Sequence, residues 1–440
     1  MRVNFADKIV GGFNYELVRG ISIQQAGAAE LGECVETMRR VRRGDLDSWT
    51  REWSALAARV ADYAQAARDA GDAATARLAY LRASNYYRMA AFYAHFTDPR
   101  HRTLWRRSTE CFAAMIPLSD RRIERVGIAY GDSRLPGYFV SAGAGPRPTL
   151  IALGGFDSTK EEVYCWIGSV AAERGWHCLI FEGPGQWGAL MDNPGLVFEA
   201  DYEKPVSAAV DYLCSRPDVD QARIALIGYS AGGYLAPRAA AGEPRISACI
   251  ANTLVVDCGE SARAGLKGLT NPKAIDSLFA VMAKTSIAAR WGFQHAQWSL
   301  GINKPHEWID VYEPFTLKGL EDRFTHPMLF LFGEDDIKDA AASSRAIVAG
   351  LVDFIASLPC QRYVHVFPRS QGASSHCQMG GLSYAHAVIF AWLDHVLCDA
   401  PAPAPADAEA GALFVDLFGR YGGKSAGQRA AALLTAVRQI

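Results

Sequence analysis

Apolar residues in the first quarter of the chain recur three and four positions apart, a spacing that predicts helices. The stretch WTREWSALAARVADYAQAARDAGDAATARLAYLRASNYYRMAAFYAHF, which starts at Trp49, carries this pattern, and its AGD segment separates two helices. The pattern extends from about Ala28 to Phe112 without a second copy at a fixed period, so a repeat array is not expected. We expect an all-helical N-terminal region over residues 1–120.

After Pro117 the pattern changes to short apolar runs bounded by turns. IERVGIAYG and LPGYFVSAG, separated by DSR, predict an antiparallel hairpin. Further apolar runs then alternate with helical stretches: TLIALGG (149–155), HCLIFEG (177–183), RIALIGYS (223–230), ISACIAN (246–252), MLFLFGEDD (328–336) and YVHVF (363–367). Strands that are apolar on both faces, each followed by a helix, predict an α/β core over residues 121–400, with a mainly parallel twisted sheet between two helical layers.

Two segments fall outside this alternation. The chain between Asn252 and Pro327 is too long for one crossover and has a helical pattern, so we expect a helical insertion at about 258–322. Together with the N-terminal helices it is expected to form a lid. In the tail, residues 401–440, APAPAPADAEAGA predicts a Pro/Ala linker and AGQRAAALLTAVRQI predicts one short amphipathic helix.

Composition excludes several classes of protein. With 45 Lys+Arg against 47 Asp+Glu and no basic block, neither nucleic acid nor a membrane surface is an expected partner. No run of 18 apolar residues and no signal-peptide core occurs, so a cytoplasmic protein is expected. The 10 cysteines include no CxxC pair and are interpreted as reduced thiols, with no metal site and no cofactor expected.

The segment Gly228-Tyr229-Ser230-Ala231-Gly232 follows an apolar strand and precedes a helical stretch. This strand-turn-helix setting is typical of the nucleophile elbow of the α/β-hydrolase fold, in which the residues two before and two after the serine, here Gly228 and Gly232, must be small. Ser230 is therefore the predicted nucleophile. The N–H of Ala231, at the positive end of the following helix, is the first predicted oxyanion donor.

A serine needs a base, and the base needs a group that orients it. In this fold the acid and then the histidine follow the serine along the chain. The segment LFLFGEDD offers carboxylates after a later strand; Asp336 is the predicted acid, with Asp335 as the alternative. His376 lies in the polar loop RSQGASSHCQMG after the last strand and is the predicted base.

The second oxyanion donor is expected in the loop after an early strand, LIALGGFDSTKEE. Two glycines there allow the backbone to approach the substrate, and the N–H of Phe156 is the predicted donor, with Asp157 as the alternative. Gly155 and Asp157 in this loop, and Tyr229 next to Ser230 in the sequence, are also candidate substrate contacts.

Several segments together resemble a known family: GGFDSTKEE, FEGPGQWG, GYSAGGY, SHCQ, and YLRASNYYRMAAFY followed by DPR. From about residue 30 to about residue 398 the chain is similar to the α/β-hydrolases typified by 2,6-dihydroxypseudooxynicotine hydrolase, a group that includes fungal pigment hydrolases that shorten polyketides. The resemblance implies a triad of Ser230, Asp336 and His376, Phe156 and Ala231 as amide donors, and a homodimer. Glu182 and Trp187 depart from the family's FDGPGQGE pattern.

The resemblance also implies cleavage of a C–C bond in a 1,3-diketone-like or acylated phenol substrate. The aromatic segment RWGFQHAQWSL in the insertion suits a pocket wall for an aromatic or polyketide-like small molecule, with Trp291 as a candidate contact, although core packing explains it equally well. Glu260 is a candidate partner for a phenol. A carboxylesterase or thioesterase would use the same triad, and a non-catalytic binding protein of the same fold is the alternative from another class.

Overall fold

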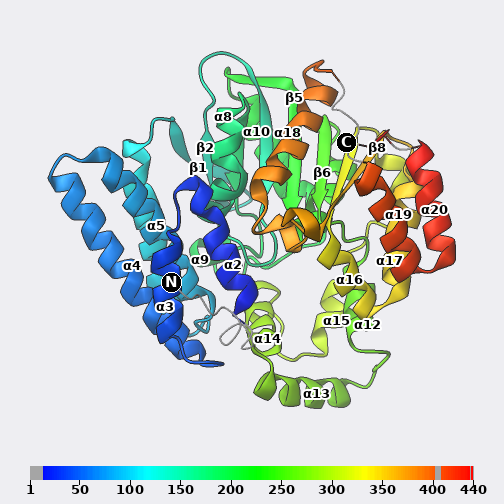
Figure 1. Ribbon diagram of the computed structural model, residues 1–440, viewed down its shortest axis with the longest axis horizontal. Helices are drawn as coiled ribbons and strands as arrows, with labels where there is room; N and C mark the ends of the chain where they lie inside the picture. The colour runs from blue at the N-terminus through cyan, green and yellow to red at the C-terminus, as the bar shows by residue number, and fades with distance from the viewer. Residues whose placement is uncertain (1–12, 402–407, 437, 440) are drawn as a thin grey trace.

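The computed structural model describes residues 13–401, 408–436 and 438–439. In this part of the chain a nine-stranded sheet runs through the centre in the order β1-β2-β4-β3-β5-β6-β7-β8-β9 (Figure 1). Strands β1 and β2 form the expected antiparallel hairpin, β2 also pairs antiparallel with β4, and the remaining pairs are parallel. The strands are β1 Ile123–Tyr130, β2 Ser133–Val140, β3 Arg147–Leu153, β4 His177–Phe181, β5 Val219–Tyr229, β6 Ala248–Asn252, β7 Met328–Gly333, β8 Arg362–Phe367 and β9 Arg438–Gln439.

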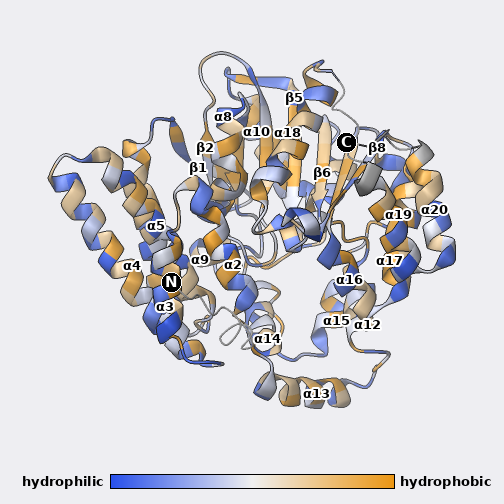
Figure 2. Ribbon diagram, viewed as in Figure 1, coloured by the Kyte–Doolittle hydropathy of each residue, from blue (hydrophilic) through white to orange (hydrophobic). Residues whose placement is uncertain are grey.

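The parallel strands are buried on both faces. In β3, Ile151 and Leu153 enter one core cluster, whereas Leu150 and Ala152 enter the cluster on the opposite face. Successive side chains of a strand point to opposite faces, so both sets must be apolar. In Figure 2, β5 and β6 are coloured mainly as hydrophobic residues, whereas hydrophilic and hydrophobic residues alternate along the outer helices.

Helices cover the two faces as the fold class predicts. Those of one face are α10 Glu203–Cys214, α11 Gly232–Gly242, α16 Glu334–Ser343 and α17 Arg345–Ser357. Those of the other face are α7 Lys160–Val163, α8 Ser169–Glu173 and α18 Leu382–Leu397, and α9 Trp187–Asp192 follows β4. The observed architecture is the α/β-hydrolase fold.

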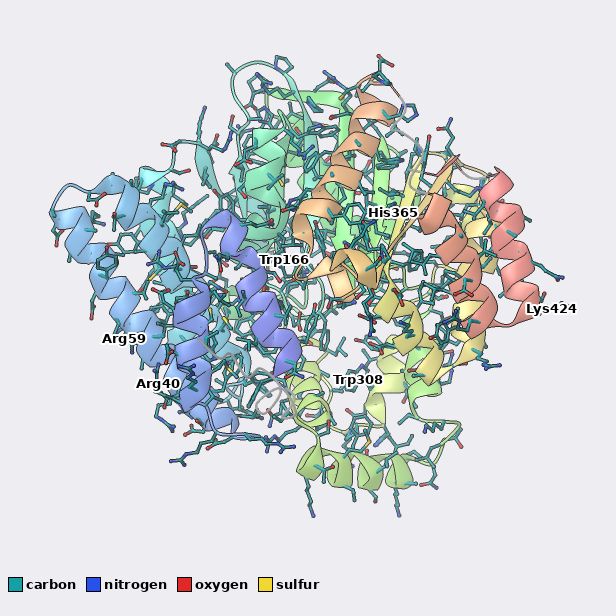
Figure 3. All side chains as sticks on the ribbon, viewed as in Figure 1. Arg40, Arg59, Trp166, Trp308, His365 and Lys424 are labelled. Atoms are coloured by element: carbon teal, nitrogen blue, oxygen red, sulfur yellow. The ribbon has the colours of Figure 1, made fainter. Side chains whose placement is uncertain are left out.

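The N-terminal region is helical in its described part: α2 Asn14–Ser22, α3 Leu31–Arg40, α4 Leu46–Asp69, α5 Ala73–Phe92 and α6 Pro99–Met115. The chain leaves the helical conformation between α4 and α5 at the AGD segment, where Asp72 caps α5 by accepting a hydrogen bond from the Thr75 N–H. Arg40 and Arg59 mark the outer side of these helices in Figure 3. Helix α2 lies upstream of the expected helical pattern, and residues 1–12 lie outside the described part.

The insertion consists of α12 Cys258–Gly265, α13 Pro272–Thr285, α14 Ile287–Ser299 and α15 Glu307–Tyr312. Its aromatic helix α14 contacts the N-terminal region, because the Trp291 indole donates to the Phe92 carbonyl oxygen at 2.7 Å and stacks on the Phe92 ring. The two segments predicted as a lid therefore touch each other.

The tail differs from its prediction. It contains two helices, α19 Ala408–Gly422 and α20 Lys424–Ala436, and α19 begins inside the expected Pro/Ala linker; residues 402–407 of that linker lie outside the described part. Phe414 and Phe418 are buried in the core cluster that contains α17, and β9 pairs with β8. The apolar spacing of Phe414, Leu417, Phe418 and Tyr421 is helical, but the alanine- and proline-rich segment before it obscured that signal. No helix in the described ranges is long and apolar enough to cross a membrane.

Candidate active site

Ser230 occupies the sharp turn between β5 and α11. Its φ is +59°, a left-handed conformation that non-glycine residues adopt at a cost and that is concentrated at functional turns. A Cβ at Gly228 would come within 2.0 Å of the Gly232 carbonyl oxygen, so the first glycine of the motif is required by this turn. The Ser230 N–H donates to the Asn252 carbonyl oxygen at 2.6 Å, which ties the turn to the end of β6.

The structure brings Ser230, His376 and Asp336 together. Ser230 Oγ lies 2.8 Å from His376 Nε2, and His376 Nδ1 lies 2.5 Å from Asp336 Oδ1. The imidazole thus connects the serine hydroxyl to a carboxylate through its two nitrogens, which is the arrangement that a base needs to accept the serine proton. The His376 side chain is 36% exposed, so it faces an accessible space.

The carboxylate of Asp336 is held in place by two further donors. Its Oδ2 accepts from the Thr253 hydroxyl at 2.7 Å and from the Gly333 N–H at 3.1 Å. The alternative acid, Asp335, instead accepts from the Ser374 hydroxyl at 2.7 Å and pairs with Arg369, so it stabilises the loop that precedes His376.

The two charged partners shift each other's pKa. Burial acts to raise the pKa of Asp336, but the charge of His376 and three hydrogen bonds outweigh it, and the pKa lies below its usual value. Burial acts to lower the pKa of His376, but Cys377 and Asp336 outweigh it, and the pKa lies well above its usual value.

The loop after β3 lies directly against the nucleophile. A Cβ at Gly155 would come within 2.7 Å of Ser230 Cβ and 3.1 Å of the Ala231 nitrogen, so only glycine fits there. In the described part of the chain, the N–H groups of Phe156 and Ala231 donate to no other group. Two backbone donors that border the serine are therefore available for an oxyanion.

Gln186 sets the orientation of this loop. Its side-chain amide donates to the carbonyl oxygens of Gly154 at 3.0 Å and Gly155 at 3.1 Å. In a trans peptide the C=O and the following N–H point in opposite directions. Fixing the Gly155 carbonyl therefore fixes the direction of the Phe156 N–H.

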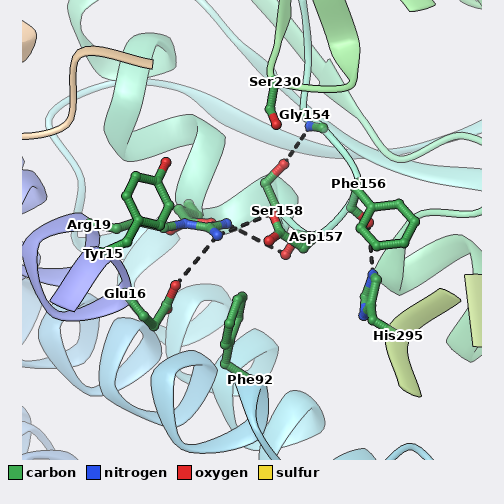
Figure 4. Close-up of polar contacts among 12 residues, drawn as sticks. Tyr15, Glu16, Arg19, Phe92, Gly154, Phe156, Asp157, Ser158, Ser230 and His295 are labelled. Atoms are coloured by element: carbon green, nitrogen blue, oxygen red, sulfur yellow. Dashed lines mark hydrogen bonds and ion pairs between the residues drawn. The ribbon is translucent and has the colours of Figure 1, made fainter. Parts of the chain in front are cut away.

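Two side chains from outside the core bind the residues that follow Gly155 in the loop. His295, on α14, lies 2.8 Å from the Phe156 carbonyl oxygen through its Nε2, and burial lowers the pKa of its imidazole. Arg19, on α2, binds the Asp157 carboxylate at 3.1 Å. Figure 4 shows these two side chains on opposite sides of the loop.

Arg19 belongs to a buried group of charges that sequence analysis missed. Its guanidinium donates to both oxygens of Glu162, at 2.7 and 2.5 Å, and lies 5.3 Å from the ring centroids of Phe92 and Trp166. Trp166 lies near the middle of the molecule in Figure 3. The apolar spacing of Phe13, Leu17 and Gly20 was the signal for α2, but it lies outside the longer helical pattern on which the prediction rested.

The segment STKEE is buried and ion-paired. Lys160 Nζ contacts Glu161 at 2.9 Å and Glu182 at 3.1 Å, and the Tyr138 hydroxyl donates to Glu161 at 2.8 Å. These contacts join the loop beside Ser230 to the segment after β4. Glu182, which departs from the family pattern, is therefore a structural partner of Lys160.

The remaining candidate substrate contacts, Tyr229, Trp291 and Glu260, each have partners within the protein. The Tyr229 ring is buried in the core and contacts Trp166. Trp291 packs on Phe92 between the two helical regions. Glu260 borders the cavity beside Ser230, but its carboxylate is bound by Lys318 at 2.6 Å.

A cavity of about 360 Å³ opens beside the serine. Ser230, Ala231, Asp336 and His376 line one end, and it extends between the segment after β6 and helices α12, α16 and α17. Within the described ranges, no three His, Cys, Asp or Glu side chains gather in a way that would hold a metal ion. The serine and the imidazole that contact each other both border this cavity.

Comparison with known proteins places the chain in a family. Residues 19–265 match the FrsA-like esterases. The chain belongs to this FrsA-like family. It is 30% identical to hydrolase acrC of Aspergillus aculeatus and 31% identical to 20-hydroxy-prefusarin hydrolase FUS2 of Gibberella moniliformis, in each case over 87% of this chain and 96% of the relative.

A solved structure supports the fold of this FrsA-like hydrolase. The crystal structure of 2,6-dihydroxy-pseudo-oxynicotine hydrolase superposes with a TM-score of 0.67, at 22% identity, over 87% of this chain and 98% of that chain. The predicted family resemblance and fold class are thereby confirmed. The chain is a hydrolase of the α/β-hydrolase fold.

Proposed function

We propose that the chain is a serine hydrolase that cleaves a C–C bond in a 1,3-diketone-like or acyl-aromatic substrate of the polyketide type. The observation that carries this proposal is the continuous contact from Ser230 through His376 to Asp336, at 2.8 and 2.5 Å. A relative at 31% identity, named as a 20-hydroxy-prefusarin hydrolase, supports a small-molecule substrate.

In the first step His376 accepts the proton of Ser230 as Oγ adds to the substrate carbonyl carbon. Asp336 stabilises the imidazolium, and the N–H groups of Phe156 and Ala231 hold the oxyanion. The C–C bond then breaks, its electron pair goes to a carbon that is stabilised as an enolate or by conjugation with a phenolate, and His376 returns the proton to that carbon. Water, deprotonated by His376, hydrolyses the remaining acyl-enzyme.

An esterase or thioesterase is the second candidate, and the family to which the chain belongs favours it, since that family is described as esterases. An ester has a better leaving group and uses the same residues. Turnover of an aryl ester and of an acyl-phloroglucinol with the same acyl group separates the two activities: ester hydrolysis without loss of the acyl-phloroglucinol would support the esterase.

The catalytic assignment is tested by a serine-directed phosphonate, with mass spectrometry of the peptide that carries Ser230. Ser230→Ala should abolish both the label and the turnover, while Ser215→Ala, at an exposed serine at the C-terminal end of α10, should change neither. An intact protein that takes up no label would instead support the non-catalytic alternative.

The homodimer and the cytoplasmic location remain predictions. Sedimentation analysis of the purified protein tests the first, and fractionation of the source cells tests the second.

A further inference from the structure

The surroundings of Ser230 have different chemistry on two sides. Towards α5 and α14 lies an aromatic cluster that consists of Phe92, Phe156, Trp187, Trp291 and His295. Its rings are in sequential contact, with centroids 4.5 Å apart for Phe92 and Trp291, 5.4 Å for Trp291 and His295, and 4.6 Å for His295 and Phe156. Trp187 joins it through His295 at 6.1 Å. Because Phe156 follows Gly155, which touches Ser230, this cluster begins beside the nucleophile.

The cavity that Ser230 borders has a mostly apolar surface, and none of the five residues of the aromatic cluster lines it. Its wall includes these apolar side chains: Leu254, Val256, Ile337, Ala340, Ile347 and Leu351. Leu254, Val256, Ile337 and Leu351 are buried in the surrounding core, so the wall is a packed surface. A volume of about 360 Å³ is within the range of about 300–1,000 Å³ that small-molecule sites span.

The charged groups at the rim of the cavity are already paired. Lys318 Nζ lies 2.6 Å from Glu260 and 3.5 Å from Asp257. The rim therefore presents two carboxylates against one ammonium group, which disfavours an anionic ligand. An uncharged aliphatic chain buries apolar surface on this wall without separating these ion pairs.

We infer that this cavity binds an aliphatic acyl chain of the substrate, and that the leaving group of the substrate lies outside it. This inference rests on the proposed function. When Ser230 adds to the ketone of an acyl-aromatic compound, only the aromatic ring carbon can leave with the electron pair, because the ring stabilises it. The acyl carbon stays bonded to Ser230 Oγ, and its chain extends into the cavity that Ser230 borders.

A series of aryl esters that runs from acetate to decanoate tests the inference. Burial of each methylene group should raise kcat/KM about fourfold, which corresponds to about 0.8 kcal/mol, until the chain exceeds the cavity. Esters of acetic acid with alcohols of increasing length form the second series, in which the chain lies on the leaving-group side and no such rise is expected.

Gly350 on α17 allows the cavity to be filled. It lines the cavity, and a Cβ there meets no atom within 4 Å. Gly350→Leu should therefore shorten the optimal acyl chain, with a much larger loss of decanoate turnover than of acetate turnover, and Ala340→Leu, from α16 on the same cavity, should do the same. Gly32→Leu is the matched control, because Gly32 is an exposed helical glycine whose Cβ would also be unobstructed.

Three results would overturn the inference: no dependence on acyl length in the wild type, equal loss of acetate and decanoate turnover in Gly350→Leu, or a response confined to the alcohol series. Binding of 2-decanone to the inactive Ser230→Ala protein, by calorimetry, tests the cavity without turnover. Gly350→Leu should weaken that binding, and unchanged binding would also overturn the inference. If the folded wild-type protein turns over none of these substrates but still binds 2-decanone, only the proposed function is refuted.

Discussion

Replacing Arg19 by methionine should destabilise the protein far more than the loss of a surface charge. Arg19 is 2% exposed and Glu162 is 0% exposed, and the two share a pair of parallel hydrogen bonds. Without Arg19, the nearest remaining cation to Glu162 is Arg88 at 3.5 Å. Breaking a buried ion pair from one side typically costs about 3–5 kcal/mol, because the other charge stays in a poorly solvated site.

The double variant Arg19→Met/Glu162→Met distinguishes this cause from lost packing. Removal of both charges leaves neither one unpaired, so its loss in free energy of unfolding should be clearly smaller than the sum of the two single losses. Arg106→Met is the control, since Arg106 is 65% exposed and pairs with Glu110 on the helix surface, where about 0.5 kcal/mol is typical.

Urea unfolding followed by circular dichroism measures these free energies, and hydrogen exchange of α2 and of residues 156–163 shows whether the loss is local. Turnover by Arg19→Met should also fall, because Asp157 loses its ion pair beside the nucleophile. Additive losses in the double variant, or a loss for Arg19→Met as small as that for Arg106→Met, would refute the reasoning.

Three further changes test other parts of the structure. Gln186→Met should lower kcat by up to about 100-fold with little change in KM, because it frees the peptide that orients the Phe156 N–H; steady-state kinetics measures both, and a raised KM with intact kcat would contradict that role. Because only neutral His376 accepts a proton and its pKa is raised, the acid limb of kcat/KM should lie above about pH 6.5. Asp336→Asn should lower kcat about 10⁴-fold and move this limb to lower pH, so a pH–rate profile with an unmoved limb would count against the pairing. Phe418→Ala should cost about 3–5 kcal/mol in thermal or urea unfolding, since Phe418 is fully buried against Phe332 and Phe414; a loss under about 1 kcal/mol would mean that α19 is peripheral.

The elements that sequence analysis predicted well are those whose signal is local. The turn at Ser230 needs a strand, a small residue at Gly228 and a helix within a few positions, and all of these are adjacent in the chain. Asp336 and His376 follow strand ends, where the order of the fold places them. Their positions could be predicted because parallel strands end at one edge of the sheet.

The elements that were missed depend on contacts between distant residues. From the sequence alone, Arg19 would be expected to be an exposed arginine in a short helix. Only its contact with Glu162, 143 positions away, shows why it is buried. Trp291 stays a predicted substrate contact, but the hydrogen bond of its indole to Phe92, 199 positions away, could not be predicted from its aromatic surroundings. Aromatic character predicts burial, and it does not predict which partner a ring will have.

The two backbone amides of the proposed oxyanion site are positioned by different parts of the chain. The Ala231 N–H is positioned by the turn and by the start of α11, so the core alone can form it. The Phe156 N–H depends on a loop that Gln186 binds from the segment after β4, His295 binds from the insertion, and Arg19 reaches from the N-terminal region. The helical regions therefore help to orient a backbone amide beside the nucleophile, because an isolated core could retain the contact of Ser230 with His376 while losing the orientation of the Phe156 N–H.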